Sequence, residues 1–347
     1  MALELTQLRE ARLYRRLEDR RVLCQLCPHF CRIDEGMKGI CYVRENRAGV
    51  LYTTSFGRLT SRNVDSVEKK PLYHFYPGSR ALSISAPGCN LHCQYCVNWA
   101  ISQMPNEYAA GPTVSPEDIV REALQSNCQS IAYTYTEPTI FFEYVEEVSR
   151  LARTSGLLNI HKTNGFMSTE MLEAAAQYMD AANVDLKAFK ETTYQHLGGK
   201  LQPVLQALRL LSSSNVWLEL STVIIPDLND TDEELTDIAR FIKHDLGVDT
   251  PWHLARFFPA YEMSHLSPTP IETLERARQI GLAEGLRYVY LSNVPLPHKQ
   301  NTSCGNCAYT IIQRHGFKLM SNHIKDGCCP NCQTRVPGVR MSAETAD

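Results

Sequence analysis

The stretch ALSISAPGCNLHCQYC, residues 81–96, joins an apolar run to three cysteines, Cys89, Cys93 and Cys96. Its first part, ALSISAP, is typical of a parallel strand that is covered on both faces. A structural zinc site normally takes four protein ligands, and a disulfide takes two cysteines. Three cysteines directly after a strand match neither pattern, so the stretch predicts a strand that leads into a site of another kind.

Six further runs have the same strand-like character. They are SIAYTYTEP (130–138), LLNIHKTNG (157–165), NVDLKAF (183–189), VWLELSTVII (216–225), WHLARFF (252–258) and YVYLSNVP (288–295). Helical segments fall between them, and repeated βα units of this size indicate an α/β barrel or an open doubly wound sheet. Seven strands, fewer than the eight of a full barrel, favour a partial (β/α) barrel.

Capping signals mark where several helices begin. Ser115 precedes Pro116 and the segment PEDIVREALQ, which is the pattern of an N-cap followed by an N1 proline. Thr231 and Glu234 form a capping box, and Gly247 is a predicted stop for that helix. The stretch Thr269-Pro270-Ile271-Glu272 repeats the same logic and predicts a further helix start.

Composition limits the class of protein. The 347 residues carry a net charge of −3, and no run of Lys and Arg suggests a nucleic-acid or membrane-surface patch. No stretch of 18 apolar residues suggests a spanning helix. The start, MALELTQLREARLYRRLEDR, predicts a charged amphipathic helix and not a signal peptide, so a cytoplasmic location is expected. In that reducing compartment, 13 cysteines indicate metal sites.

The cysteines fall into three groups that suggest three parts of the chain. Cys24, Cys27, Cys31 and Cys41 lie in the first group, and Cys304, Cys307, Cys328, Cys329 and Cys332 lie in the last. We expect an N-terminal helix and cysteine-rich module over 1–75, the partial barrel over 76–297, and a zinc-ribbon-like module over 298–347. Cys128 stands alone and is most simply a buried small hydrophobe.

Polar residues follow the predicted strands. In α/β barrels the chemistry lies on the loops after the strand C-termini, so these side chains should meet at one mouth. They are Glu137, Thr163, Asn164, Asp185, Lys187, His253, Ser292 and Asn293. Asp185 and Lys187 are two apart, so on a strand they share a face. They fit either an internal ion pair or a zwitterionic amino-acid ligand.

The cysteine spacing carries a family resemblance. Cys89-x3-Cys93-x2-Cys96, with Tyr95 before the last cysteine, resembles the signature of radical S-adenosylmethionine (SAM) enzymes. Further segments resemble pyruvate formate-lyase activating enzymes: TNGF (163–166), VDLK (184–187), HLGG (196–199), TVIIPDLND (222–230) and PWH (251–253). The whole chain, including CQLCPHFC, KPLYHFYPGS and the CPNC tail, is similar to the uncharacterised radical SAM enzyme of the AmmeMemoRadiSam system.

The resemblance implies an oxidoreductase. Three thiolates hold three irons of a 4Fe–4S cluster, and SAM chelates the fourth. Reductive cleavage of SAM gives a 5′-deoxyadenosyl radical, which removes a hydrogen atom from an unknown substrate. Flavodoxin or ferredoxin is the implied type of electron donor. Two alternatives stay open: an activating enzyme that installs a glycyl radical on a partner protein, and a non-catalytic metal-bound scaffold.

The resemblance also implies SAM contacts, and Thr163 and Asn164 are expected among them. Glu137 is either a contact to the SAM amino group or a carboxylate at a helix N-terminus; the family's Gly-Gly-Glu-Pro is Tyr-Thr-Glu-Pro here. Lys187 is implied as partner of the SAM carboxylate, and Asp185 as an amino or ribose contact. Lys162 stands where activating enzymes carry an acidic residue. His253 is either an adenosyl contact or a core histidine.

The flanking cysteines predict further metal sites. Cys304-x2-Cys307 and Cys329-x2-Cys332 have the spacing of a zinc ribbon, with an auxiliary iron–sulfur cluster as the alternative. Cys328 could replace Cys329. The N-terminal Cys24-x2-Cys27-x3-Cys31-x9-Cys41 predicts zinc or a second cluster that relays electrons, because tetrahedral thiolate sites suit zinc and iron alike.

Overall fold

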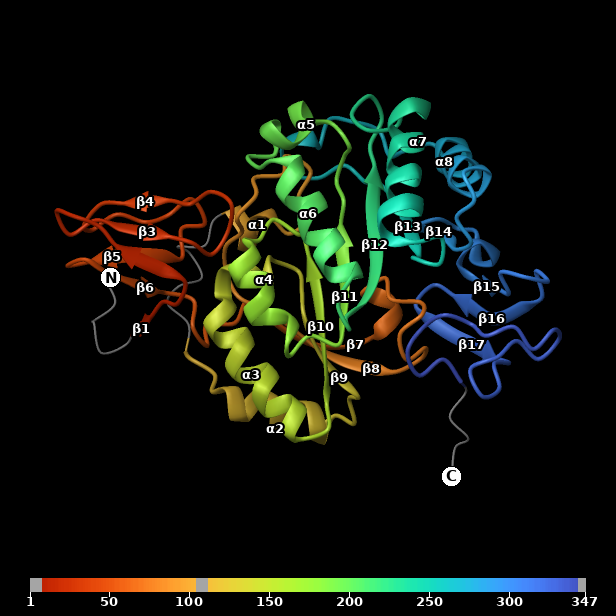
Figure 1. Cartoon of the computed structure of the whole chain (residues 1–347), viewed down its shortest axis with the longest axis horizontal. Helices are drawn as coiled ribbons and strands as arrows, with labels where there is room; N and C mark the ends of the chain where they lie inside the picture. Colours follow the sequence, from red (N-terminus) through yellow and green to blue (C-terminus); the bar gives the residue numbers. More distant parts are fainter. Residues whose placement is uncertain (1–7, 104–111, 343–347) are drawn as a thin grey trace.

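The computed structural model describes residues 8–103 and 112–342. An eight-stranded sheet lies at its centre (Figure 1), in the order β14-β13-β12-β11-β10-β9-β8-β7. The strands are β7 (Ser61–Ser66), β8 (Arg80–Ser85), β9 (Ser130–Tyr133), β10 (Leu158–Thr163), β11 (Ala181–Asp185), β12 (Trp217–Ile224), β13 (Trp252–Arg256) and β14 (Val289–Ser292). Strands β8 to β14 run parallel, and β7 is antiparallel to β8.

The seven predicted strands are therefore the seven parallel strands, and the partial barrel is confirmed. The two end strands of the described sheet, β7 and β14, do not pair with each other, so the barrel stays open. Sequence patterning missed β7, because SRNVDS has a single apolar residue, Val64, and that side chain is exposed. The central sheet thus begins at Ser61, which is before the expected boundary at residue 76.

The helices are α1 (Trp99–Gln103), α2 (Pro116–Gln125), α3 (Phe142–Thr154), α4 (Thr169–Ala176), α5 (Glu191–His196), α6 (Leu201–Ser212), α7 (Asp232–Phe241) and α8 (Ile271–Ala283). Among them, α2, α3, α6 and α8 pack on strands of the central sheet. Short 3-10 turns span Val67–Lys69, Pro138–Phe141, Tyr261–Met263 and Pro297–Gln300, and a π turn, Ile242–Leu246, extends α7. α3 packs on β9 and β10, and α8 packs on β13 and β14.

Two of the three predicted caps are confirmed. Ser115 and Thr231 accept hydrogen bonds from the backbone N–H groups of Asp118 and Glu234. The reciprocal half of the predicted capping box is wrong, because the Glu234 carboxylate accepts from the Phe189 backbone amide and pairs with Lys190. Gly247, at φ 107°, stands directly after the π turn. The predicted cap at Thr269 is wrong, because its hydroxyl donates to the Ile224 carbonyl 2.5 Å away, and α8 begins after Pro270 without a side-chain cap.

The N-terminal module is built from short strands. They are β1 (Arg9–Glu10), β2 (Tyr14–Arg16), β3 (Val22–Cys24), β4 (Arg32–Ile33), β5 (Arg44–Arg47) and β6 (Val50–Thr53). The helix expected at the start of the chain is wrong over residues 8–20, while residues 1–7 of that expectation lie outside the described part. Arg9 and Glu10 pair with β6, and Leu13 has a φ of 53°, which a right-handed helix excludes. Pairing with distant strands has overridden the local pattern.

The C-terminal module lies at the opposite end of the central sheet from the N-terminal strands (Figure 1). It contains β15 (Thr302–Ser303), β16 (Thr310–His315) and β17 (Lys318–Asn322). Buried Arg314 donates to the Tyr73 carbonyl at 2.7 Å, and its guanidinium lies 4.3 Å from the Tyr73 ring centroid. Within residues 8–103 and 112–342, no helix has the length and apolar character needed to cross a lipid bilayer.

Candidate functional site

The loop after β8 carries the cysteine triad, Cys89, Cys93 and Cys96. It leaves the carboxyl end of the strand through Gly88, whose φ is +101°. A side chain at Gly88 would meet the Cys41 carbonyl at 2.9 Å, so glycine is required by both conformation and space. The His92 amide donates to Leu197 at 2.8 Å, which anchors the loop.

The surroundings of the triad fit a cationic iron centre. Burial raises the pKa of the Cys89 and Cys93 thiols, so positive charge must compensate before they become thiolates. Cys89 Sγ accepts hydrogen bonds from the Leu91 amide at 3.5 Å and the Asn164 amide group at 3.8 Å. Cys96 Sγ lies 3.3 Å from the Ser102 hydroxyl. These sulfurs are thus provided with donors, as cluster ligands require.

Glu137, at the end of the loop after β9, is buried and held by several donors. Its Oε1 accepts from Thr139 and from the Thr163 hydroxyl at 2.7 Å. Its Oε2 accepts from the backbone N–H of Asn164 at 2.8 Å. It also caps the turn Pro138–Phe141, as the alternative interpretation expected. Oε2 keeps capacity for a second donor. The contact to SAM stays a prediction.

Asp185 is the last residue of β11 and Lys187 follows the strand, and a third residue joins them. Lys162, on β10, forms an ion pair with Asp185 Oδ1, while Lys187 Nζ lies 3.4 Å from Asp185 Oδ2. Burial and these two cations act in opposite directions on Asp185, and the cations prevail, so its pKa is lowered. Burial opposes the charged form of Lys187, but Cys93, Tyr95 and Asp185 outweigh it and raise its pKa.

His253, on β13, is buried beside a carboxylate. Its Nε2 lies 2.6 Å from Glu219 Oε2, and Tyr73 and Tyr290 pack against its ring. Burial lowers the pKa of His253, although Glu219 opposes this. Within the described residues, His253 Nδ1 has no hydrogen-bond partner. The core-histidine interpretation fits this environment, and an adenosyl contact stays a prediction.

Sequence reasoning missed several residues near the site. Asp65, on β7, accepts from Lys70 at 2.6 Å and from the Tyr135 hydroxyl. Asn90, beside Cys89, accepts from the Asn164 amide group at 2.8 Å and donates to the Phe166 carbonyl. The position of Asn90 inside the cysteine loop was a usable signal. Nothing in the polar run of β7 singled out Asp65.

Cys24, Cys27, Cys31 and Cys41, here called the N-terminal cysteine site, line one small pocket together with Arg44 and Asn90. Burial raises the pKa of Cys27, Cys31 and Cys41, and the neighbouring Cys24 thiol acts in the same direction on each. The structure therefore brings together the four cysteines that the sequence had grouped.

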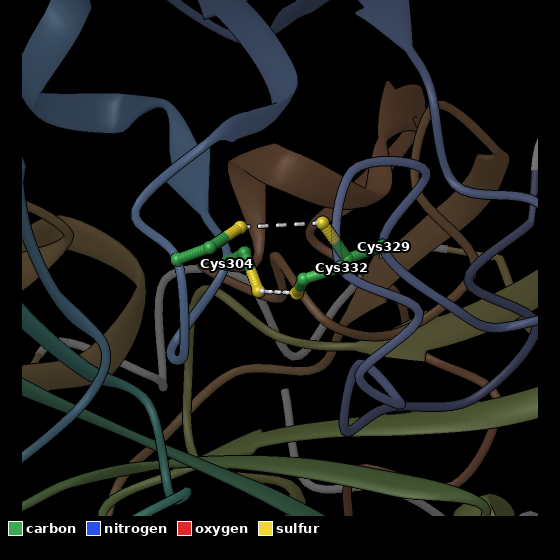
Figure 2. Close-up of side chains that lie close together, drawn as sticks. Cys304, Cys329 and Cys332 are labelled. Atoms are coloured by element: carbon green, nitrogen blue, oxygen red, sulfur yellow. Dashed lines mark hydrogen bonds between the residues drawn. The ribbon is translucent and has the colours of Figure 1, made fainter.

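Cys304, Cys307, Cys329 and Cys332, here called the C-terminal cysteine site, form a tight group whose four Sγ atoms all lie within 4.8 Å of one another. Figure 2 shows Cys304, Cys329 and Cys332 converging from two loops. The Sγ distances are 3.6 Å for Cys304–Cys332 and 3.7 Å for Cys307–Cys329. This group could bind one metal ion, and Cys328 is not part of it.

Comparisons with known proteins agree with this geometry. A model of the Radical SAM superfamily matches residues 83–242, from β8 to the end of α7. The uncharacterized protein MJ0808 of Methanocaldococcus jannaschii is 40% identical over 331 residues, which are 95% of this chain and 99% of that protein. A pyruvate formate-lyase-activating enzyme of Streptococcus mutans is 24% identical over 214 residues, 56% of this chain and 79% of the relative.

A solved structure supports the fold. The crystal structure of Streptococcus suis SuiB bound to S-adenosylmethionine matches with a TM-score of 0.51 and 13% identity, over 71% of this chain and 60% of that one. At this identity the likeness shows the fold alone. The superfamily match includes the strand and loop that carry the cysteine triad and the strands that carry Thr163 and Asp185. Residues 83–242 of this chain therefore form a domain of the Radical SAM superfamily.

Proposed function

We propose that this chain binds a 4Fe–4S cluster through Cys89, Cys93 and Cys96, cleaves S-adenosylmethionine reductively, and abstracts hydrogen from a substrate. The observation that supports this is the meeting of three strand ends around the triad. Asn164, after β10, donates to Cys89 Sγ, and Lys187, after β11, lies 5.9 Å from the ring centroid of Tyr95.

The cluster, when bound, would supply one electron for cleavage of the sulfonium bond of SAM into methionine and a 5′-deoxyadenosyl radical. The chain's own residues hold and orient the ligand. Lys187 is the proposed partner of the SAM carboxylate, and Glu137 Oε2 is the proposed acceptor for its amino group. Asp185 is proposed as an amino or ribose contact and His253 as an adenosyl contact.

Thr163 contributes by holding Glu137. Its hydroxyl donates to Glu137 Oε1 at 2.7 Å and also accepts from the Gly165 amide at 3.1 Å. Since the carboxylate is fixed by Thr139 as well, its free lone pair has a set direction. The side chain of Asn164 is proposed to donate to the cluster ligand Cys89, while its backbone N–H holds Glu137 Oε2.

Other parts of the proposal concern metals and partners. Zinc is proposed for the C-terminal cysteine site, because Zn–S bonds of about 2.3 Å at a tetrahedral centre require sulfurs ~3.8 Å apart. The two measured Sγ distances, 3.6 and 3.7 Å, agree with this. A flavodoxin or ferredoxin is the proposed electron donor, and the cytoplasm is the proposed location.

A second candidate function is the activation of a glycyl radical enzyme. The similarity to a pyruvate formate-lyase-activating enzyme favours it. In that case the substrate is a glycine on a partner protein. Electron paramagnetic resonance of a candidate partner, incubated with this chain, SAM and a reductant, distinguishes the two: a glycyl radical doublet supports activation.

The test of the proposed function uses anaerobically purified full-length chain. With dithionite and SAM, the wild type should release 5′-deoxyadenosine and show a cluster signal that changes when SAM is added. Cys93→Ala should lose both, while Cys128→Ala, which removes a buried thiol outside the three sites, should keep both. Release of 5′-deoxyadenosine by Cys93→Ala at the wild-type rate would refute the assignment of the cysteine triad, and no release by the wild type would favour the non-catalytic scaffold.

A further inference from the structure

The N-terminal cysteine site differs in geometry from the C-terminal one. Among residues 8–103 and 112–342, the C-terminal four are the group whose donor atoms all lie within 4.8 Å of one another. Cys24, Cys27, Cys31 and Cys41 line a common pocket but do not form so tight a group. One zinc ion draws four sulfurs to ~3.8 Å separations, so the N-terminal arrangement is too wide for it.

A four-iron cluster suits a wider set of sulfurs. Each cysteine binds a different iron at a corner of the cluster, so the sulfurs stand farther apart than around a single ion. The cysteine triad, Cys89, Cys93 and Cys96, likewise does not form a tight group in the described chain. The N-terminal cysteines therefore resemble the triad in this respect, and all four line one pocket.

A buried cation faces the N-terminal cysteine site. Arg44 is 1% exposed, and its Nη1 donates to Cys24 Sγ at 3.3 Å. A guanidinium stays protonated, so Arg44 is a charged donor to the Cys24 sulfur. Its other charged contact is Glu143, and Nε of Arg44 has no hydrogen-bond partner among the described residues. Donors to cysteine sulfur are one of the means by which proteins adjust the potential of iron–sulfur clusters.

The site lies directly against the triad loop. His29, between Cys27 and Cys31, lies with Nε2 2.7 Å from the Asn90 carbonyl oxygen. Asn90 in turn accepts from Asn164, which donates to Cys89 Sγ. On the other side, the carbonyl oxygen of Cys41 lies 2.9 Å from the position that a Cβ atom on Gly88 would take. Two separate contacts thus join the two cysteine loops.

We infer that Cys24, Cys27, Cys31 and Cys41 hold an auxiliary four-iron cluster, not zinc, with Arg44 as a hydrogen-bond donor to its Cys24 ligand. The site is separate from the triad, and its metal content does not depend on SAM cleavage. The proposal goes beyond the proposed function, so each can fail without the other.

Metal and sulfide analysis of the full-length chain tests this inference. After anaerobic reconstitution, the wild type should contain ~8 iron and ~8 sulfide per chain, as two four-iron clusters require. Zinc should be ~1 per chain, at the C-terminal cysteine site. Changing all three triad cysteines to Ala should leave ~4 iron and ~4 sulfide, with an electron paramagnetic resonance signal that SAM does not alter.

Matched variants separate the two sites. Cys27→Ser with Cys31→Ser should leave ~4 iron, and the remaining signal should still respond to SAM. Cys128→Ala should retain the wild-type content. If the N-terminal variant does not fold, the triad variant, in which the N-terminal site is intact, decides the question. A triad variant that contains no iron and ~2 zinc would overturn the inference, whatever the activity of the wild type.

Discussion

Lys187 Nζ lies 3.4 Å from Asp185 Oδ2, while Lys162 holds the other oxygen of the same carboxylate. Asp185 therefore has two cations, and the loss of one leaves it neutralised by the other. Lys187 has three N–H donors and uses only one of them on Asp185, so it retains capacity for a ligand carboxylate. Asp185 and Lys187 therefore do not form an exclusive ion pair.

This arrangement predicts the effect of Lys187→Met. If Lys187 binds the SAM carboxylate, the loss of a charged hydrogen bond worth ~1.5–3 kcal/mol should weaken SAM binding roughly 10- to 150-fold. The melting temperature should change little, because Lys162 still pairs with Asp185. Both quantities can be measured on one anaerobic preparation with its cluster content checked.

Lys318→Met, on the exposed face of β17, is the matched control and should leave SAM affinity unchanged. Unchanged affinity in Lys187→Met would remove this residue from the site. A lowered melting temperature with normal affinity would assign it a structural role.

The C-terminal cysteine site predicts a loss of metal and of stability on Cys307→Ala. The module's small apolar core surrounds the cysteines, so the bound metal should supply much of its folding free energy. The variant should lose ~1 equivalent of metal and melt at a lower temperature. Cys328→Ala should keep both, since Cys328 lies outside the tight group. Equal metal loss in the two variants would contradict this ligand set.

His161 predicts a dependence of stability on pH. Burial alone lowers its pKa to about 3, whereas an unfolded histidine titrates near ~6.5. Between these values the unfolded chain binds a proton that the folded chain excludes, so stability falls as pH falls below ~6.5.

His161→Phe should remove this contribution, which amounts to ~1.4 kcal/mol per pH unit in that window. Urea denaturation of the wild type and the variant at several values from pH 7 to pH 5 measures it. From pH 7 to pH 5, the free energy of unfolding should fall more for the wild type than for His161→Phe. His265→Phe, at an exposed position, supplies the control. Parallel curves for His161→Phe and the wild type would refute the prediction.

Arg44 and Glu143 form a buried ion pair, with side chains 1% and 3% exposed. Arg44→Met should destabilise the chain by ~3–5 kcal/mol, because Glu143 is then buried without its cation. Adding Glu143→Leu should recover most of this loss, since the double variant has no charge left at either position of the pair. A double variant as unstable as Arg44→Met alone would show that the pair does not carry the effect. Urea denaturation with the metal content held constant is the measurement.

Several features of the fold could be predicted because they depend on neighbours along the chain. The apolar runs that became β8 to β14 have the residue pattern of buried parallel strands, and Ser115 and Thr231 cap helices through residues three positions ahead. The cysteine triad could be assigned because its spacing and its place after a strand are both local. The C-terminal cysteine group could be predicted from two short cysteine motifs in the same way.

Other features depended on partners far along the chain. The first residues after position 8 form strands because β6 and β3 offer backbone pairs to them, although their own pattern indicates a helix. β7 has a polar sequence and is a strand because β8 binds it. Thr269 bonds to Ile224, 45 positions away, and so does not cap α8.

The sequence by itself determined the order of the parallel strands, the cysteine triad at the end of the first of them, and the two flanking cysteine groups. Only the tertiary structure decided that Lys162 shares Asp185 with Lys187, that His253 faces Glu219, and that the N-terminal cysteine site lies against the triad loop. Periodicity and spacing express short-range backbone preferences. Which buried charged groups pair with one another depends on desolvation and on packing across the folded sheet, and these exist only once the chain has folded.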